Sequence, residues 1–170
     1  MLFITRVLIT RIKTKVRAVK SPKAFFIEIQ DSCGKFPVSF STLKRFIRKI
    51  LVKEKIKSAS LFFLLVSDLT MRRLNKKFLK LDRTTDVLSF DLKNRLTSKY
   101  CLVGDIVISM DAAFASSKIL NISFKEELCR YLIHGILHLT CYDDTTPLKK
   151  KRMWARQEEL LSTLRMKRGI

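Results

Sequence analysis

The stretch SFKEELCRYLIHGILHL, residues 123–139, carries both a helix start and two histidines four residues apart. Ser123 with Glu126 three positions later is the sequence signature of a capped helix N-terminus. Apolar residues then recur at helical spacing, which predicts one long amphipathic helix. On that helix His134 and His138 project from one side, opposite the apolar arc, so we expect them to face a cleft.

Two histidines spaced in this way are typical of a metal site, which needs at least one further donor. Cys141, Asp143 and Asp144 follow the helix and are all chemically competent ligands. If the helix continued, Cys141 would stay near the histidines, whereas a turn after Leu139 would bring Asp143 or Asp144 back toward them. Spacing alone leaves the third donor open.

Gly135 excludes one class of zinc enzyme. In HExxH metalloproteases a glutamate follows the first histidine and acts as the general base, and here that position is glycine. Glycine inside a helix costs about 1 kcal/mol relative to alanine. We therefore expect a substrate or another part of the backbone to approach closely at Gly135.

The rest of the chain alternates between strand and helix patterns. Strands are predicted at residues 25–30, 60–66, 86–92 and 102–109, and further helices at residues 43–51, 71–81, 111–120 and 147–164. Asp68 is expected to cap the second of these helices and Pro147 to begin the last. This order predicts an α+β domain, a small mixed four-stranded sheet covered by helices, one of which carries the two histidines.

The charge of the chain indicates a polyanionic partner. Among its 170 residues, 35 lysines and arginines outnumber 15 acidic residues, which gives a formal net charge of +20. Nucleic acid is the first expectation and an anionic membrane surface the second. The longest apolar run, residues 61–66, is far shorter than the roughly 20 residues that span a bilayer. The four cysteines include no CxxC pair, and we expect them to be reduced.

Residues 1–24 differ from the remainder, because they contain seven basic residues and no acidic one. They are interpreted as a basic N-terminal extension, and residues 25–170 as a single domain. An arginine-rich start without acids resembles an organellar transit peptide, while a basic tail or an over-extended start of translation explains it equally well. Without a secretory leader the predicted location is cytoplasmic, with organellar targeting as the alternative.

Three blocks of the sequence resemble the YbeY family of endoribonucleases. Residues 134–144, HGILHLTCYDD, resemble the family signature HGxLHLxGYDH. Leu74-Asn75 with residues 85–90, TDVLSF, resemble its LN and PTDVLSF stretches, and residues 104–109, GDIVIS, resemble its GDI strand. In order, these matches extend the resemblance over about residues 25–165.

The resemblance implies a zinc-dependent endoribonuclease that is specific for single-stranded RNA. Its implied role is maturation of the 3′ end of small-subunit ribosomal RNA and ribosome quality control, with ribosomal RNA and the small subunit as partners. His134 and His138 match two family ligands, and the third family histidine aligns with Asp144. An aspartate oxygen ligates zinc at about 2.0–2.2 Å, so the implied site has two histidines and one aspartate. Cys141 replaces a family glycine.

A second departure concerns catalysis. The arginine that the family carries after its LN pair aligns with Leu79, which cannot stabilise charge on a phosphate. Lys80 or Arg83 is the predicted substitute, and Ser89 and Asp86 of the matched block are expected in the cleft. Loss of the arginine supports an alternative function, a non-catalytic, metal-stabilised assembly factor that binds RNA or the ribosome.

Two histidines and a carboxylate also suit non-haem iron. The basic surface and the matched blocks favour RNA over a small oxidisable substrate.

Overall fold

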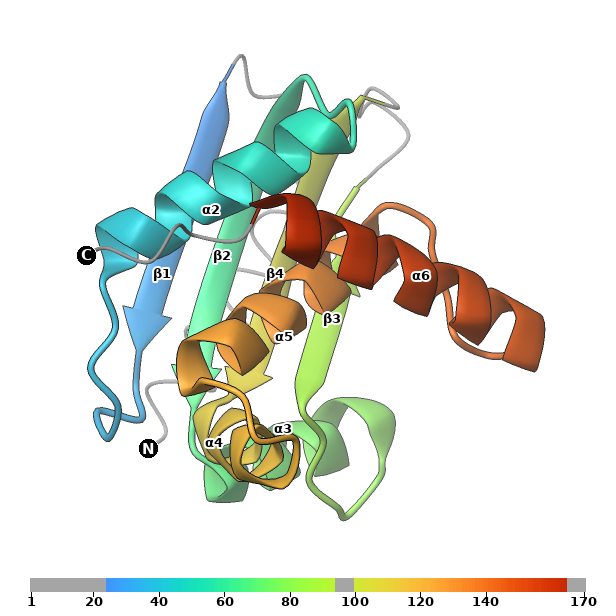
Figure 1. Ribbon diagram of the computed structural model, residues 1–170. Coiled ribbons are helices and arrows are strands. Elements are labelled where there is room, and N and C mark those ends of the chain that lie inside the picture. Colours follow the sequence, from blue (N-terminus) through green and yellow to red (C-terminus); the bar gives the residue numbers. More distant parts are fainter. Residues whose placement is uncertain (1–23, 94–99, 165–170) are drawn as a thin grey trace.

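The computed structural model describes residues 24–93 and 100–164, and within them four strands and five helices follow one another in the predicted order (Figure 1). They are β1 (Phe25–Asp31), α2 (Phe40–Lys53), β2 (Ser58–Val66), α3 (Asp68–Leu79), β3 (Val87–Asp91), β4 (Cys101–Ser109), α4 (Met110–Ile119), α5 (Phe124–Leu139) and α6 (Pro147–Leu164). The predicted α+β class is confirmed. Nearly all of the predicted N-terminal extension, residues 1–23, lies outside the described residues.

The sheet is mixed, with strand order β1-β2-β4-β3. β1, β2 and β4 run parallel, and β3 pairs antiparallel with β4 at one edge. All nine residues of β4 are buried, as expected for an inner strand covered on both faces. The antiparallel β3 brings the loop that precedes it to the same end of the sheet as the carboxyl end of β4.

Alternate side chains of β2 enter two different apolar clusters, which explains its unbroken apolar run. Leu61, Phe63 and Leu65 pack with α2, α5 and α6 in the larger cluster. Their neighbours along the strand pack with Met71 and Leu74 of α3 in the second cluster. Figure 1 shows α2, α5 and α6 together in front of the sheet. None of the described helices is long and apolar enough to cross a membrane.

The N-terminus of α5 forms as predicted, because the Ser123 hydroxyl accepts a hydrogen bond from the backbone N–H of Glu126 at 3.1 Å. The predicted cap of α3 is wrong. Asp68 is the first helical residue, and its carboxylate accepts hydrogen bonds from Ser109 and Thr84 of neighbouring segments. The helix also ends earlier than predicted, at Leu79, because Lys80 adopts the left-handed conformation.

Gly135 allows α5 to lie directly on the sheet. A Cβ atom at this position would stand 2.7 Å from Cγ2 of Ile106 and 3.3 Å from the hydroxyl of Ser89. The Ser89 hydroxyl donates a hydrogen bond to the Gly135 carbonyl at 3.1 Å. The close neighbour expected at this glycine is therefore the sheet and not a substrate, and Ser89 ties the helix to β3 instead of lining the cleft.

Candidate metal centre

Three predicted ligands meet at the end of α5. Donor atoms of His134, His138 and Asp144 all lie within 4.8 Å of one another. The Nε2 atoms of the two histidines are 3.0 Å apart, and the rings are nearly perpendicular. The histidines are half-buried and the aspartate is exposed. A cluster of three protein ligands that is accessible to solvent on one side can hold a cation that also contacts a substrate.

A sharp reversal of the chain after α5 brings Asp144 to the histidines. The helix ends at Leu139, and Cys141 takes the left-handed conformation with φ of 70°. The backbone N–H of Tyr142 then donates to the carbonyl of Leu137 at 3.1 Å, which closes the turn. Of the two alternatives, the chain therefore turns after Leu139 and does not continue the helix through Cys141.

The three candidates for the third ligand have different surroundings in this turn. Cys141 is exposed and is not part of the donor group found among the described residues. Asp143 accepts hydrogen bonds from Lys149 and Thr145, which hold the pKa of its carboxyl well below the usual range. Asp144 is therefore the candidate whose carboxylate is placed with the histidines.

The histidines are prepared to bind a cation. Nδ1 of His134 lies 3.0 Å from Oε1 of Gln157, and because that oxygen only accepts, the proton is on Nδ1 and the lone pair on Nε2. Burial lowers the pKa of His138, and the nearby His134 lowers it further, which favours the neutral ring that can bind a cation. Two nitrogens on one tetrahedral zinc lie about 3.3 Å apart, close to the observed separation. The residues present therefore fit a zinc ion.

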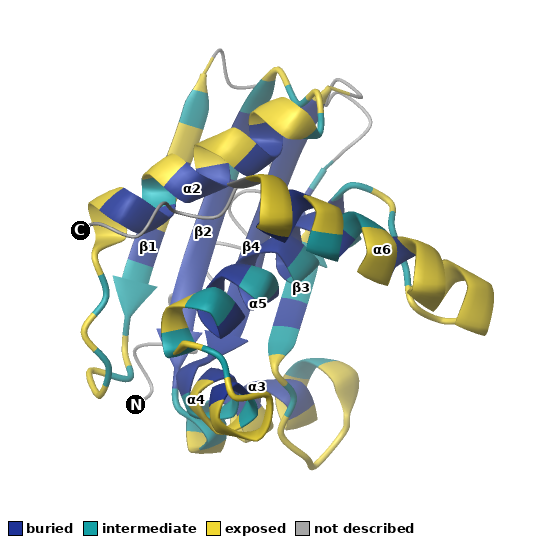
Figure 2. Cartoon of the chain, viewed as in Figure 1, coloured by how far each residue is buried: buried dark blue, intermediate teal, exposed yellow. Residues whose placement is uncertain are grey.

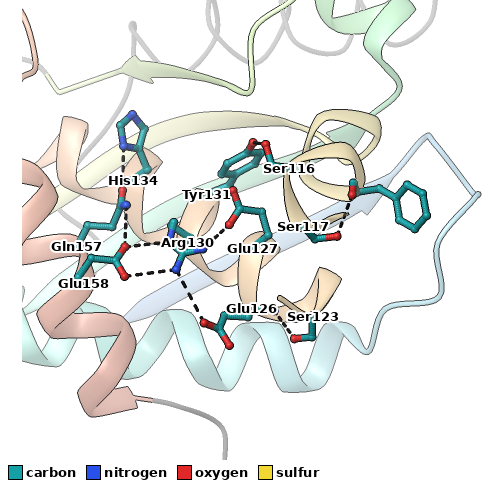
Figure 3. A network of polar contacts seen from close by, with 11 residues as sticks. Ser116, Ser117, Ser123, Glu126, Glu127, Arg130, Tyr131, His134, Gln157 and Glu158 are labelled. Atoms are coloured by element: carbon teal, nitrogen blue, oxygen red, sulfur yellow. Dashed lines mark hydrogen bonds and ion pairs between the residues drawn. The ribbon is translucent and has the colours of Figure 1, made fainter. Parts of the chain in front are cut away.

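Gln157 is itself held by a network of charged groups between α5 and α6 (Figure 3). Its amide donates to Glu158 at 3.2 Å, which fixes the orientation of the amide. Glu158 pairs with Arg130 at 2.8 Å, and Arg130 also pairs with Glu127 and Glu126. These carboxylates raise the pKa of Arg130, despite its partial burial. The network joins the two helices next to the candidate ligands.

A cleft of about 310 Å³ opens beside the cluster. Residues from five parts of the chain line it: Asp86, Ser116, Glu127, Arg130, Tyr131, His134, Asp144, Lys150, Met153, Trp154 and Gln157. Asp86 is in the cleft as predicted, immediately before β3. Tyr131 is anchored by Ser116, with their hydroxyl oxygens 3.0 Å apart.

The predicted catalytic cations lie elsewhere. Arg83 lines a separate hollow with Asp68, Arg72 and Asp82, and its carbonyl accepts a hydrogen bond from Asn75 at 2.8 Å. Lys80 is exposed, and its ammonium donates to the carbonyl of Lys77. Neither side chain is among those that line the cleft.

Sequence reasoning missed Gln157 and Trp154 of α6, and it gave Lys150 of the same helix no place in the cleft. One signal was present for Gln157. It lies four residues after Met153 and three before Leu160, so it is a polar residue on the buried stripe of its helix and is only 5% exposed. The sequence gives no comparable signal for Lys150 and Trp154, because their place in the cleft depends on how α6 crosses α5.

Comparisons with known proteins show which family the chain resembles. A family model described as Endoribonuclease YbeY matches residues 28–165. A protein named Endoribonuclease YbeY from Persephonella marina is 31% identical over 82% of this chain and 92% of its own length. One of the same name from Myxococcus xanthus is 40% identical over 70% of this chain, which corresponds to 41% of that longer protein.

A solved structure has the same fold. The solution structure of a protein from Thermotoga maritima superimposes with a TM-score of 0.58, at 29% identity. The match covers 82% of this chain and 88% of the other.

Proposed function

The chain belongs to the endoribonuclease YbeY family, and from this membership we propose that it is a metal-dependent endoribonuclease that cleaves single-stranded RNA. The observation that carries the metal dependence is the convergence of His134, His138 and Asp144 within 4.8 Å. Zinc is the proposed ion, since two imidazoles and a carboxylate form a borderline set of ligands that suits it. When bound, it supplies Lewis-acid polarisation of a phosphodiester.

The residues around the cluster have separate tasks in this proposal. Gln157 keeps His134 in the tautomer that presents Nε2 to the cation. Lys150, an exposed cation in the wall of the cleft, attracts the phosphate backbone. The large excess of basic residues supports the proposal, because counterion release from RNA drives binding that does not depend on base sequence.

Arg83, with Lys80 as second candidate, is proposed to stabilise charge on the reacting phosphate or on the adjacent RNA backbone. Asp86 lines the cleft and Thr84 lines the hollow that contains Arg83. Two residues apart, these positions are separated by at most about 7 Å of chain. An RNA strand that leaves the cleft past Asp86 would therefore reach Arg83.

The proposed biological role is maturation of the 3′ end of small-subunit ribosomal RNA, together with ribosome quality control. It rests on family membership and on the basic charge of the chain. The proposal includes one catalytic domain, residues 25–170, preceded by a basic extension. It also assigns a cytoplasmic location, or an organelle that contains ribosomes if residues 1–24 direct the chain there.

One observation favours a second function, a non-catalytic assembly factor that binds RNA or the ribosome. Leu79 stands at the position of the family arginine and leaves 53% of its surface exposed at the end of α3. An exposed leucine at this position cannot stabilise negative charge on a phosphate.

A cleavage assay separates the two functions. Purified protein, loaded with zinc, is incubated with a labelled single-stranded RNA and with a duplex of the same sequence. The enzyme proposal expects cleavage of the single strand that stops when a chelator is added and returns with excess zinc. Tight binding of the RNA without any cleavage, under zinc or other divalent metals, would establish the assembly-factor function instead.

A further inference from the structure

Trp154 has a position that packing does not explain. It lies on α6 and lines the cleft, yet 62% of its surface is exposed. The buried side of this helix includes Met153, Gln157, Leu160 and Leu161, whereas Trp154 is mostly exposed. A large aromatic side chain that remains open to solvent beside a functional cleft marks a binding surface.

Lys150 lies in the same wall of the cleft as Trp154. The two residues are four positions apart, so they share one face of α6, and both line the cleft with Asp144. Lys150 is exposed, and the structure shows no ion pair between it and any residue in the ranges it describes. Arg130, the other cation in the cleft, is already paired with three glutamates. Lys150 is therefore the lysine that can bind a phosphate here.

We propose that Trp154 is a stacking platform for one nucleobase of the RNA strand, with Lys150 on a neighbouring phosphate. This inference rests on the proposed function, because it assigns the cleft to RNA. Base stacking on an aromatic ring tolerates any sequence, since every base has a π-face. It also discriminates between strands, because bases in a duplex are already stacked on their neighbours and must be unpaired to reach the ring.

The geometry of α6 connects this platform to the metal centre. Lys150, Trp154 and Gln157 follow one another at spacings of four and three residues, so they are neighbours on the helix surface, with exposed Lys150 and Trp154 at the edge of the buried side that holds Gln157. Gln157 contacts His134 directly. A base stacked on Trp154 therefore places the adjoining phosphodiester over the histidine cluster. Figure 2 shows that the first turns of α6 are exposed, which leaves room for a strand to approach.

The test uses the fact that Trp154 is the only tryptophan of the chain, so intrinsic fluorescence reports this side chain alone. Zinc-loaded protein is mixed rapidly with a 12-nucleotide single-stranded oligouridine, and emission is read before cleavage proceeds. We expect strong quenching that saturates with RNA, and little change with a duplex of equal length.

Binding of a labelled oligouridine, followed by anisotropy, provides the second readout. Trp154→Ala should weaken binding about tenfold, Trp154→Phe should restore most of the affinity, and zinc content should be unchanged. The matched control is Leu148→Ala, which removes a side chain that is 78% exposed on the same helix and is not among those lining the cleft. Lys150→Ala should reduce the slope of log affinity against log salt by about one.

The outcomes separate this inference from the proposed function. Unchanged fluorescence at saturating RNA, or parental affinity in Trp154→Ala, would overturn the stacking role even if the protein cleaves RNA, and would point to a protein partner for this surface. Quenching by an RNA that is then not cleaved would uphold the stacking role and contradict the enzymatic proposal.

Discussion

Nδ1 of His134 on α5 lies 3.0 Å from Oε1 of Gln157 on α6, so a residue of one helix fixes the tautomer of a candidate metal ligand on another. The contact makes the metal centre dependent on the packing of the last helix. It also makes Gln157 a positioning residue, because it acts on the cation only through the histidine.

The first prediction follows from this contact. Gln157→Leu removes the acceptor and places an apolar side chain of similar size on the buried face of α6. Loss of such an outer hydrogen bond lowers metal affinity about 10- to 100-fold. We expect that loss in a zinc titration against a competing chelator, with a circular dichroism spectrum like that of the parent. Gln157→Glu retains an acceptor and should recover most of the affinity; equal weakening in both variants would show that the hydrogen bond is not the cause.

The second prediction concerns the third ligand. Asp144→Ala should reduce zinc content sharply, because its carboxylate is the one placed within 4.8 Å of the histidine nitrogens. Cys141→Ser should leave the zinc content unchanged, since this thiol is exposed and outside the donor group. Elemental analysis of the two purified variants checks both statements. The reverse result, zinc lost from Cys141→Ser and kept in Asp144→Ala, would make the thiolate the ligand.

These two predictions differ in how far the sequence anticipates them. Local patterns predict the helix with its Ser123 cap and the shared face of the two histidines, because both depend on residues within a few turns of one another. The choice between Asp144 and Cys141 depends on the backbone of the turn, where φ of 70° at Cys141 reverses the chain. No property of cysteine favours that conformation, so spacing alone leaves the choice open.

The residues that α6 adds to the site are harder to predict from the sequence. Gln157 reaches His134 across 23 positions of sequence, and only the crossing of two helices brings them together. Asp68 shows that contacts with distant residues can also override a local pattern. Its position before an apolar stripe is typical of a cap, but the hydroxyls of Ser109 and Thr84, distant in sequence, compete for its carboxylate.

The third prediction tests the packing that supports the site. Gly135→Ala should destabilise the protein, because the new Cβ would stand 2.7 Å from Cγ2 of Ile106, a fully buried side chain. Overpacking of this kind costs about 1–3 kcal/mol, which outweighs the gain of up to about 1 kcal/mol in helix propensity. Thermal unfolding should show a lower Tm than the parent. Lys125→Ala, at an exposed position of the same helix, is the control and should change Tm little.

The fourth prediction addresses the missing arginine. If Arg83 stabilises charge on the RNA, Arg83→Ala should lower the cleavage rate by about 10²- to 10³-fold with zinc content unchanged. Leu79→Arg should raise the rate, since it restores a guanidinium at the family position. Lys80→Ala tests the second candidate, and Lys77→Ala, an exposed cation of the same helix, serves as control. Parental rates in Arg83→Ala, Lys80→Ala and Leu79→Arg would exclude this loop from catalysis.

The most direct test of the central claim, that RNA is cleaved at a metal centre built from His134, His138 and Asp144, is a zinc titration of cleavage. Metal-free parent protein and His134→Ala are each given increasing zinc, and the initial rate of cleavage of one single-stranded RNA is measured. The parent should cleave nothing without metal and reach a plateau at one zinc per chain, while His134→Ala should stay inactive at that level. Full cleavage by the metal-free parent, or an identical titration curve for His134→Ala, would contradict the claim.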